Sequence, residues 1–556
     1  MGRTANHAMV IAQLVIDGKR YGIHNFIVPL RGDDHKPLPG VSVGDIGPKM
    51  GFNSMDNGCC AFDRVRIPRT NMAMRYQQVD KDGRYTSNGS QEESRIAYFT
   101  MMQVRAHIVR GAGKKLATAV TIATRYSILR RQGFRDERSK QPASGHAEHQ
   151  ILDYTIQMHR LLPLLATSYG FQFAGQGMMN RLRRLERVLM RGESGRDGGG
   201  GPDTLKQFHA ASSGLKSLCT SITAAGIEDC RKACGGQGYL QSSGIPEHLG
   251  TFLQMCTVEG ENHMLTQQVV RVLLQQLASA RTGGPVGADC LYMTRLLARE
   301  KEAATARFAV NRVSSCPAKT PEAMRDADVL YAALEHRAFR LLRGVEAGLA
   351  RDVKGGKTSS EAWNRALVEV YRASNAHSYL LVFRAFYEAV SSLKPTGGVL
   401  VRGAQHTAVR GVQEQPEGER TTLDQPTWSS LDLLLSLLGL YWLQNDMGDF
   451  VEDGYLNEHQ AKWVREELVE ILHLVRPMAL SLVDAWDFTD FQLNSAIGRF
   501  DGQAYQALLE TTTRNPMNQR DPVEGYEDHL EPVIREAREA RLEREVTQRS
   551  DHRSKL

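Results

Sequence analysis

The sequence predicts a mainly α-helical protein with a partial β domain at its start. Residues 1 to about 80 contain strand-like apolar runs separated by tight-turn pairs. From about residue 92 onwards, apolar residues recur at three- and four-residue spacing over many turns. Because three or four strands make a poor sheet on their own, we expect the β domain, of a barrel type, to be incomplete.

Length and composition exclude several protein classes. At roughly 100–200 residues per domain, 556 residues suffice for two to four domains. No apolar run approaches the ~20 residues that a membrane-spanning helix needs. The net charge of +6 comes from scattered Lys and Arg, which suits an anionic substrate and does not favour nucleic acid. The eight cysteines form no CxxC pair, so we expect reduced thiols and no metal site.

The β part begins with two strands, predicted over residues 8–16 and 21–30. Asp17-Gly18 joins them and is a favourable tight-turn pair. A second turn, Asp56-Asn57-Gly58, precedes another predicted strand that closes at Pro68.

The helical part is interrupted by three glycine-rich or polar stretches. Residues 191–203 predict a flexible surface loop, residues 281–287 a linker, and residues 391–428 a disordered insertion. We therefore expect three domains over residues 1–80, 81–280 and 281–556. The predicted helices cover residues 94–132, 150–189, 204–234, 262–279, 291–312, 321–352, 359–391, 428–450 and 457–487.

Two segments have the composition of a phosphate site, although each also has a structural interpretation. Gly235-Gly236 follows a helix, where free N–H groups can hold a phosphate or where the glycines simply end the helix. Arg125, Arg130 and Arg131 end another helix, where they complement its dipole unless one of them grips a pyrophosphate.

Glu259 is the candidate catalytic residue of the stretch CTVEGENHML. Glu261 and Asn262 are better placed to cap the helix that begins near residue 263, which leaves Glu259 spare. A carboxylate beside apolar residues can act as a base near neutral pH. Spacing alone leaves catalysis and a cap or solvated side chain as alternatives.

The sequence finishes with Ser554-Lys555-Leu556. This tripeptide is read by a peroxisomal import receptor as an address. It predicts a protein of the peroxisome matrix, preceded by a charged and exposed tail.

Taken together, these segments resemble the acyl-CoA oxidases, the peroxisomal relatives of the acyl-CoA dehydrogenases. The resemblance covers nearly the whole chain except the loop near residue 197 and residues 391–428. It rests on stretches such as DDHKPLPGVSVGDIGPKMGF, RYSILRRQ, AGIEDCRKACGGQGYLQSSGIPEH, TVEGEN and HLVRPMALSLVDAWDFTD.

The resemblance implies a homodimeric FAD enzyme of fatty acid β-oxidation. Glu259 would remove the α-proton of an acyl-CoA, and its backbone N–H would bond the thioester oxygen. The β-hydrogen would leave as hydride to the flavin, giving a trans-2-enoyl-CoA, and molecular oxygen would reoxidise the flavin to give hydrogen peroxide. Arg131 and Gln150 match positions that contact FAD. Gly235 and Gly236 match the turn that receives the partner subunit's FAD pyrophosphate.

The resemblance also leaves alternatives open. Family chains begin upstream of Met1, and their N-terminal helical domain and early strands, with TE-x-GHG and WPGG stretches, have no counterpart here. We therefore expect the reaction for an intact protein and an exposed core face with weak FAD binding for this chain alone. The alternatives are a dehydrogenase that passes electrons to a carrier protein, and an inactive fragment that is the partner subunit of a full-length oxidase.

Overall fold

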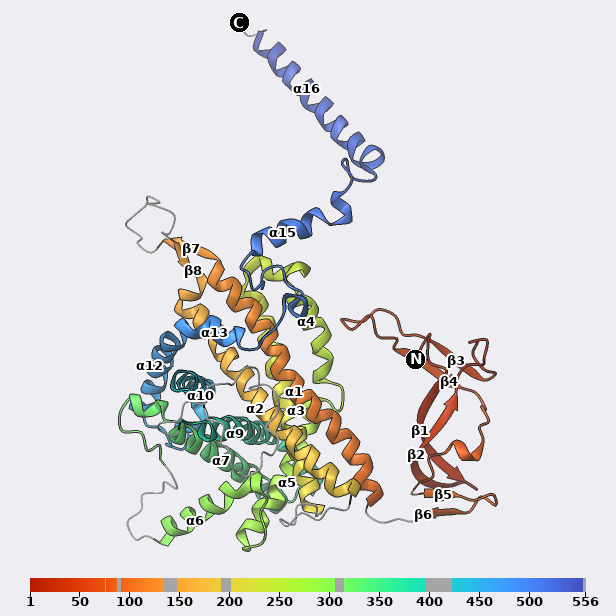
Figure 1. Cartoon of the computed structure of the whole chain (residues 1–556), viewed down its shortest axis with the longest axis vertical. Coiled ribbons are helices and arrows are strands. Elements are labelled where there is room, and N and C mark those ends of the chain that lie inside the picture. Colours follow the sequence, from red (N-terminus) through yellow and green to blue (C-terminus); the bar gives the residue numbers. More distant parts are fainter. Residues whose placement is uncertain are drawn as a thin grey trace.

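The computed structural model contains a strand-rich N-terminal part and a large helical body (Figure 1). It describes residues 1–75, 77–87, 92–134, 148–191, 202–305, 315–395 and 423–553. A loop of the N-terminal part reaches the helical body, where a Cβ added to Gly51 would lie 2.3 Å from the backbone of Gly250. The predicted class, mainly helical with a partial β domain, is confirmed.

The strands of the N-terminal part pair in antiparallel twos. The predicted hairpin is confirmed, and its turn places both Asp17 (φ 49°) and Gly18 (φ 77°) in the left-handed region. The predicted strand before Pro68 is shorter than expected, because Arg64 also turns left-handed (φ 50°). Strand pairing continues beyond residue 80. The strands are β1 His7–Ile16, β2 Lys19–Pro29, β3 Val41–Asp45, β4 Gly58–Phe62, β5 Gln77–Val79 and β6 Tyr85–Ser87.

One face of the β1–β2 hairpin is apolar and exposed. Met9, Ile11 and Ile23 are each about two-thirds exposed or more, at 68%, 69% and 71%. On the opposite face, His24 and Val28 are buried. The hairpin therefore shows the exposed core-like face that its sequence predicts for an incomplete β domain.

Helices make up most of the other described residues, and the long ones lie close to their predicted positions. The predicted helix 428–450 divides at Asp446, and 457–487 divides at a 3₁₀ turn, Arg476–Met478, that contains a proline. The helices are α1 Glu92–Leu129, α2 Thr155–Arg191, α3 Pro202–Ala233, α4 Ile245–Phe252, α5 Asn262–Arg281, α6 Leu291–Thr305, α7 Ala327–Lys354, α8 Ser359–Arg365, α9 Leu367–Ser392, α10 Gln425–Asn445, α11 Met447–Val451, α12 Glu458–Val475, α13 Ala479–Asp484, α14 Asp490–Leu493, α15 Ala504–Thr513 and α16 Glu531–Arg553.

Two short strands between α1 and α2 were not predicted. β7 Arg131–Phe134 pairs antiparallel with β8 Glu148–Gln150, so α1 ends before residue 132 and α2 begins after residue 150. Strands of three or four residues are too short to show a period of two. The predicted loop at 191–203 and insertion at 391–428 fall largely outside the described residues, at 192–201 and 396–422.

The helices on both sides of residue 281 share one apolar core. For example, Phe173 of α2 stacks on Phe386 of α9 with ring centroids 5.0 Å apart. The predicted domain boundary at residue 281 stays a prediction. None of the described helices combines the length and the apolar character that a membrane span requires.

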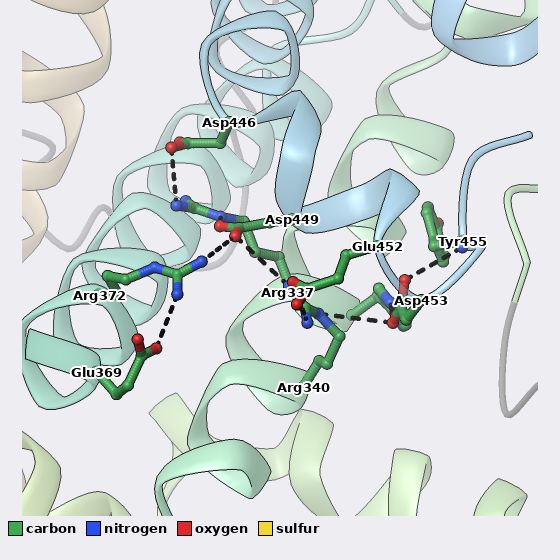
Figure 2. Close-up of polar contacts among 10 residues, drawn as sticks. Arg337, Arg340, Glu369, Arg372, Asp446, Asp449, Glu452, Asp453 and Tyr455 are labelled. Atoms are coloured by element: carbon green, nitrogen blue, oxygen red, sulfur yellow. Dashed lines mark hydrogen bonds and ion pairs between the residues drawn. The ribbon is translucent and has the colours of Figure 1, made fainter. Parts of the chain in front are cut away.

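An ion-pair cluster around the buried Arg337 and Asp449 joins α7, α9 and the α10–α11 junction (Figure 2). Arg337 of α7 donates to Asp449 at 2.8 Å and lies 3.0 Å from Asp446. Arg372 of α9 bonds to the other oxygen of Asp449. Burial alone would raise the pKa of Asp449, but the two arginines bring this pKa below its usual value. The cluster therefore locks the three helix segments through ionised groups.

Because the apolar face of the β1–β2 hairpin is exposed, polar substitutions on it should have little effect on stability. Replacing Ile11 and Ile23 by Thr should change the free energy of unfolding by only about 0.5 kcal/mol, because both side chains are already exposed. The double variant should also bind less of an apolar fluorescent dye. Leu30→Thr is the control and should cost about 2 kcal/mol or more, since Leu30 is fully buried. Unchanged dye binding in the double variant would contradict the exposed face.

Candidate active site

Glu259 lies in a strained turn between α4 and α5. The 3₁₀ turn Leu253–Cys256 precedes it and Asn262 begins α5. Glu259 has φ 57° and Gly260 has φ 107°. Left-handed backbone at a residue with a side chain costs of order 1–2 kcal/mol, so the surrounding structure must hold Glu259 there.

Two buried cations hold the turn by its carbonyl groups. Arg105 of α1 donates from Nε to the Glu259 carbonyl at 2.9 Å and from Nη1 to Ser213 Oγ of α3 at 3.0 Å. Lys216 of α3 donates from Nζ to the Gly260 carbonyl at 2.7 Å. Charge-assisted bonds of this kind are among the stronger hydrogen bonds in proteins.

The start of α5 is capped by Glu261 alone, which confirms half of the predicted capping. The Glu261 carboxylate accepts from the backbone N–H groups of His263 and Met264 at 2.9 and 3.1 Å. Its hydrogen bond with the His263 side chain is the main reason that the pKa of Glu261 is lowered. The prediction was wrong for Asn262, whose side chain instead bonds to Thr220 and Lys216 of α3.

The carboxylate and the backbone N–H of Glu259 remain available for another molecule. Among the described residues, no hydrogen bond or ion pair uses the Glu259 carboxylate, and no carbonyl or side chain accepts from its N–H. Glu259 itself is half-buried. The turn therefore presents a free carboxylate and a free N–H from one residue.

Gly235 and Gly236 follow the end of α3 and face open space. A Cβ added to either glycine would meet no atom within 4 Å in the described structure. Gly235 has φ 58°, which explains its glycine by backbone conformation alone. Gly236 does not have a positive φ, and no atom of the described residues lies within 4 Å of the position that its Cβ would take. A ligand that approaches its backbone closely is one explanation for a glycine at this position.

Arg131 and Gln150 lie opposite each other in the β7–β8 ladder. Arg131 donates to the Glu148 carbonyl at 3.1 Å. Arg476 donates to Gln150 Oε1 at 2.6 Å and lies 2.7 Å from Asp153. Sequence reasoning missed Arg476, although it lies within the family-like stretch HLVRPM.

Of the three arginines near the end of α1, Arg125 is structural. It is buried and bonds to Asp484 at 2.8 Å and to the Gly498 carbonyl at 2.8 Å. Arg130 and Arg131 follow the helix end. Arg131 therefore remains a candidate for phosphate binding, whereas Arg125 does not.

The candidate cofactor residues share one end of the helical body. Arg105 of α1 bonds to Ser213 of α3, and further along both helices the Ala112 carbonyl of α1 accepts from Thr223 of α3. The two helices therefore run parallel. Gln157 of α2 bridges their final turns, donating to Ser127 Oγ at 3.1 Å and to the Ala233 carbonyl at 2.9 Å. The Glu259 turn does not lie at this end but beside the middle of α1 and α3.

Comparison with known protein families gives two matches. A model described as "Acyl-CoA oxidase, C-alpha1 domain" matches residues 98–274, and a model described as "Acyl-CoA oxidase" matches residues 326–535. Together they cover most of the helical body.

Similar proteins and structures agree with these matches. Peroxisomal acyl-coenzyme A oxidase 1 from Rattus norvegicus is 37% identical over 534 residues, covering 96% of this chain and 72% of the relative. The structure of Arabidopsis thaliana acyl-CoA oxidase 1 matches with a TM-score of 0.81 at 35% identity, covering 96% of this chain and 73% of the other. Acyl-CoA oxidase-1 of Caenorhabditis elegans, solved with FAD and ATP, matches with a TM-score of 0.79 at 33% identity, covering 96% and 71%. The chain therefore belongs to the acyl-CoA oxidase family.

Proposed function

We propose that this chain is an FAD-dependent acyl-CoA oxidase in which Glu259 is the catalytic base. Family membership supports the reaction, which converts an acyl-CoA to a trans-2-enoyl-CoA. The observation that carries the assignment of the base is the free carboxylate of Glu259 in a turn held from behind by buried cations.

The α-proton of a thioester is a very weak acid, so its removal needs both a base and a stabilised oxygen. In the proposed reaction the Glu259 carboxylate takes the α-proton as the α C–H bond breaks. The N–H of the same residue donates to the thioester oxygen, where negative charge develops. Because one turn supplies both groups, their separation is set by the backbone.

The residues at the shared end of α1 and α3 fit a bound FAD. Gly236 gives a backbone surface without a side chain, Arg131 supplies a cation and Gln150 an amide. We propose that Arg131 and Gln150 hold one FAD, and that Gly235 and Gly236 receive the pyrophosphate of the FAD bound by the partner in a homodimer. When bound, FAD accepts the β-hydrogen with its two electrons and passes the electrons to molecular oxygen, which yields hydrogen peroxide.

A peroxisomal location is supported by the names of the relatives, which are peroxisomal enzymes. Ser554, Lys555 and Leu556, which lie outside the described residues, are the tripeptide that the import receptor would bind. The chain ahead of them is the exposed helix α16, which extends away from the helical body (Figure 1).

A second candidate function is a non-catalytic partner subunit of a longer oxidase. The exposed apolar face of β1–β2 favours it, because such a face can pack against strands of another chain. The relatives described above are oxidases, which favours oxygen over a carrier protein as the electron acceptor. Oxygen consumption without an added electron acceptor distinguishes the oxidase from a dehydrogenase and from a non-catalytic subunit.

The role of Glu259 predicts a specific loss. Glu259→Gln should lower kcat by about 10²–10⁴-fold, because the amide cannot accept the α-proton, while folding and flavin content stay unchanged. Glu261→Gln is the matched control, since this neighbouring acid caps α5 and bonds to the His263 side chain. It should lower thermal stability slightly and leave kcat unchanged. Unchanged turnover in Glu259→Gln would refute Glu259 as the base, and the two variants are compared by steady-state oxygen consumption.

The role of Gly236 predicts a loss of binding without a loss of stability. Gly236→Ala should change the unfolding free energy of the apoprotein by only about 0.5 kcal/mol, because the added methyl meets no atom of the described residues. It should still weaken FAD binding in a fluorescence titration. Gly235→Ala should destabilise the apoprotein as well, since φ 58° is unfavourable for alanine. Wild-type FAD affinity in Gly236→Ala would contradict the assignment.

A further inference from the structure

Arg105 is an unusual buried arginine in this chain. It is 4% exposed, and among the described residues it forms no hydrogen bond or ion pair with a carboxylate. Other buried arginines do pair with acids, such as Arg125 with Asp484 and Arg337 with Asp449. A buried charge without an acid partner is costly, so its retention calls for another explanation.

We propose that Arg105 is a positioning residue for the base, which holds the Glu259–Gly260 turn in its left-handed conformation. This inference rests on the proposed function of Glu259. Arg105 touches neither the substrate nor the reacting atoms in this proposal, and acts through the backbone of Glu259.

The hydrogen bonds of Arg105 and Lys216 restrict two backbone rotations that set the conformation of the turn. The position of a residue's carbonyl fixes its ψ angle, so Arg105 restricts ψ at Glu259 and Lys216 restricts ψ at Gly260. Both carbonyls are directed at α1 and α3. In a trans peptide the N–H lies opposite the carbonyl, so the Gly260 N–H is directed away from Arg105. The two hydrogen bonds thereby prevent the peptide planes of the turn from flipping.

The guanidinium is itself fixed at two points. Its Nε bonds to the Glu259 carbonyl and its Nη1 to Ser213 Oγ, which is fully buried. A planar group with two separate donors defines a direction, whereas an ammonium defines only a point of charge. Burial lowers the pKa of Arg105, and the negative charge of Glu259 opposes this change. The guanidinium therefore also places a positive charge near the base.

Lys216, on α3, supplies the second hydrogen bond to the turn. It is fully buried and donates to Asn262 Oδ1 at 2.9 Å as well as to the Gly260 carbonyl. Burial lowers its pKa to about 8. Since Lys216 also holds the first residue of α5, it has a structural role in helix packing. Arg105 is the cleaner test of positioning for this reason.

Arg105→Lys keeps the charge and removes the two-point grip. We expect kcat to fall about tenfold or more with KM changed by about twofold or less, because the base is displaced while substrate binding elsewhere is kept. Flavin content should match the wild type. Hydrogen–deuterium exchange of the peptide that covers residues 253–264 should become faster, with or without flavin.

A substrate analogue separates proton removal from the rest of the reaction. An acyl-CoA with sulfur at the β-position has an acidic α-proton and no β-hydride to lose. Its enolate, formed when the proton moves to Glu259, should give a long-wavelength absorption beside the bound flavin. This absorption should be weaker in Arg105→Lys than in the wild type at saturating analogue.

Arg337→Lys is the matched control for a buried arginine. It should lower the melting temperature, because Arg337 joins α7 to Asp446 and Asp449, and leave kcat and the analogue absorption unchanged. If Arg105→Lys does not fold, Ser213→Ala takes its place, since it frees one end of the guanidinium without removing the charge. This variant should lower kcat several-fold at wild-type flavin content.

Wild-type kcat and wild-type analogue absorption in folded, flavin-loaded Arg105→Lys would overturn the inference. The same result in Ser213→Ala would overturn it where Arg105→Lys does not fold. Failure of the proposed function is read separately from Glu259→Gln. If that variant still forms the enolate, Glu259 is not the base, whatever the Arg105 variants show.

Discussion

The close parallel packing of α1 and α3 is the constraint on which the candidate site depends. The two helices pack so closely that a Cβ added to Gly226 would lie 2.7 Å from Leu116. Arg105 and Ser213 bond across their middle, and Thr223 bonds to the Ala112 carbonyl further along. A shift of one helix along the other would move the cations that hold the Glu259 turn. It would also separate the two helix ends that Gln157 bridges. One packing arrangement therefore positions both the proposed base and the proposed cofactor residues.

The strain at Glu259 has a chemical consequence. An ordinary helix start would direct the side chain of a preceding acid to the free N–H groups, as Glu261 does at α5. The left-handed turn at Glu259 leaves its carboxylate and its N–H outside that arrangement. The bonds from Arg105 and Lys216 offset the strain. The turn is thus less stable than an ordinary one, but it leaves the carboxylate and the N–H of Glu259 unpaired among the described residues. Proton removal beside a stabilised oxygen needs two such groups.

The sequence predicted the fold class, the β1–β2 hairpin and most of the long helices, because their apolar periods extend over many residues. It did not predict β7 and β8, whose few residues show no period, or the division of the last predicted helices. Glu259 became the candidate base through the resemblance to the acyl-CoA oxidases, after Glu261 had been recognised as the better cap. Arg105, Lys216 and Gln157 were not found, since their partners lie far away in the sequence and no local pattern marks a buried cation on a distant carbonyl. Asn262 was misassigned for the same reason: its partners are on α3.

We propose that this chain binds FAD and oxidises an acyl-CoA through the groups described. The most direct measurement is the visible flavin spectrum of the purified 556-residue chain before and after addition of a saturated acyl-CoA without oxygen. We expect a bound flavin band that bleaches on addition and returns when oxygen is admitted. A bound flavin whose band is unaffected by acyl-CoA would contradict the account. Absence of a flavin band after incubation with FAD would contradict it too and would favour a non-catalytic partner subunit.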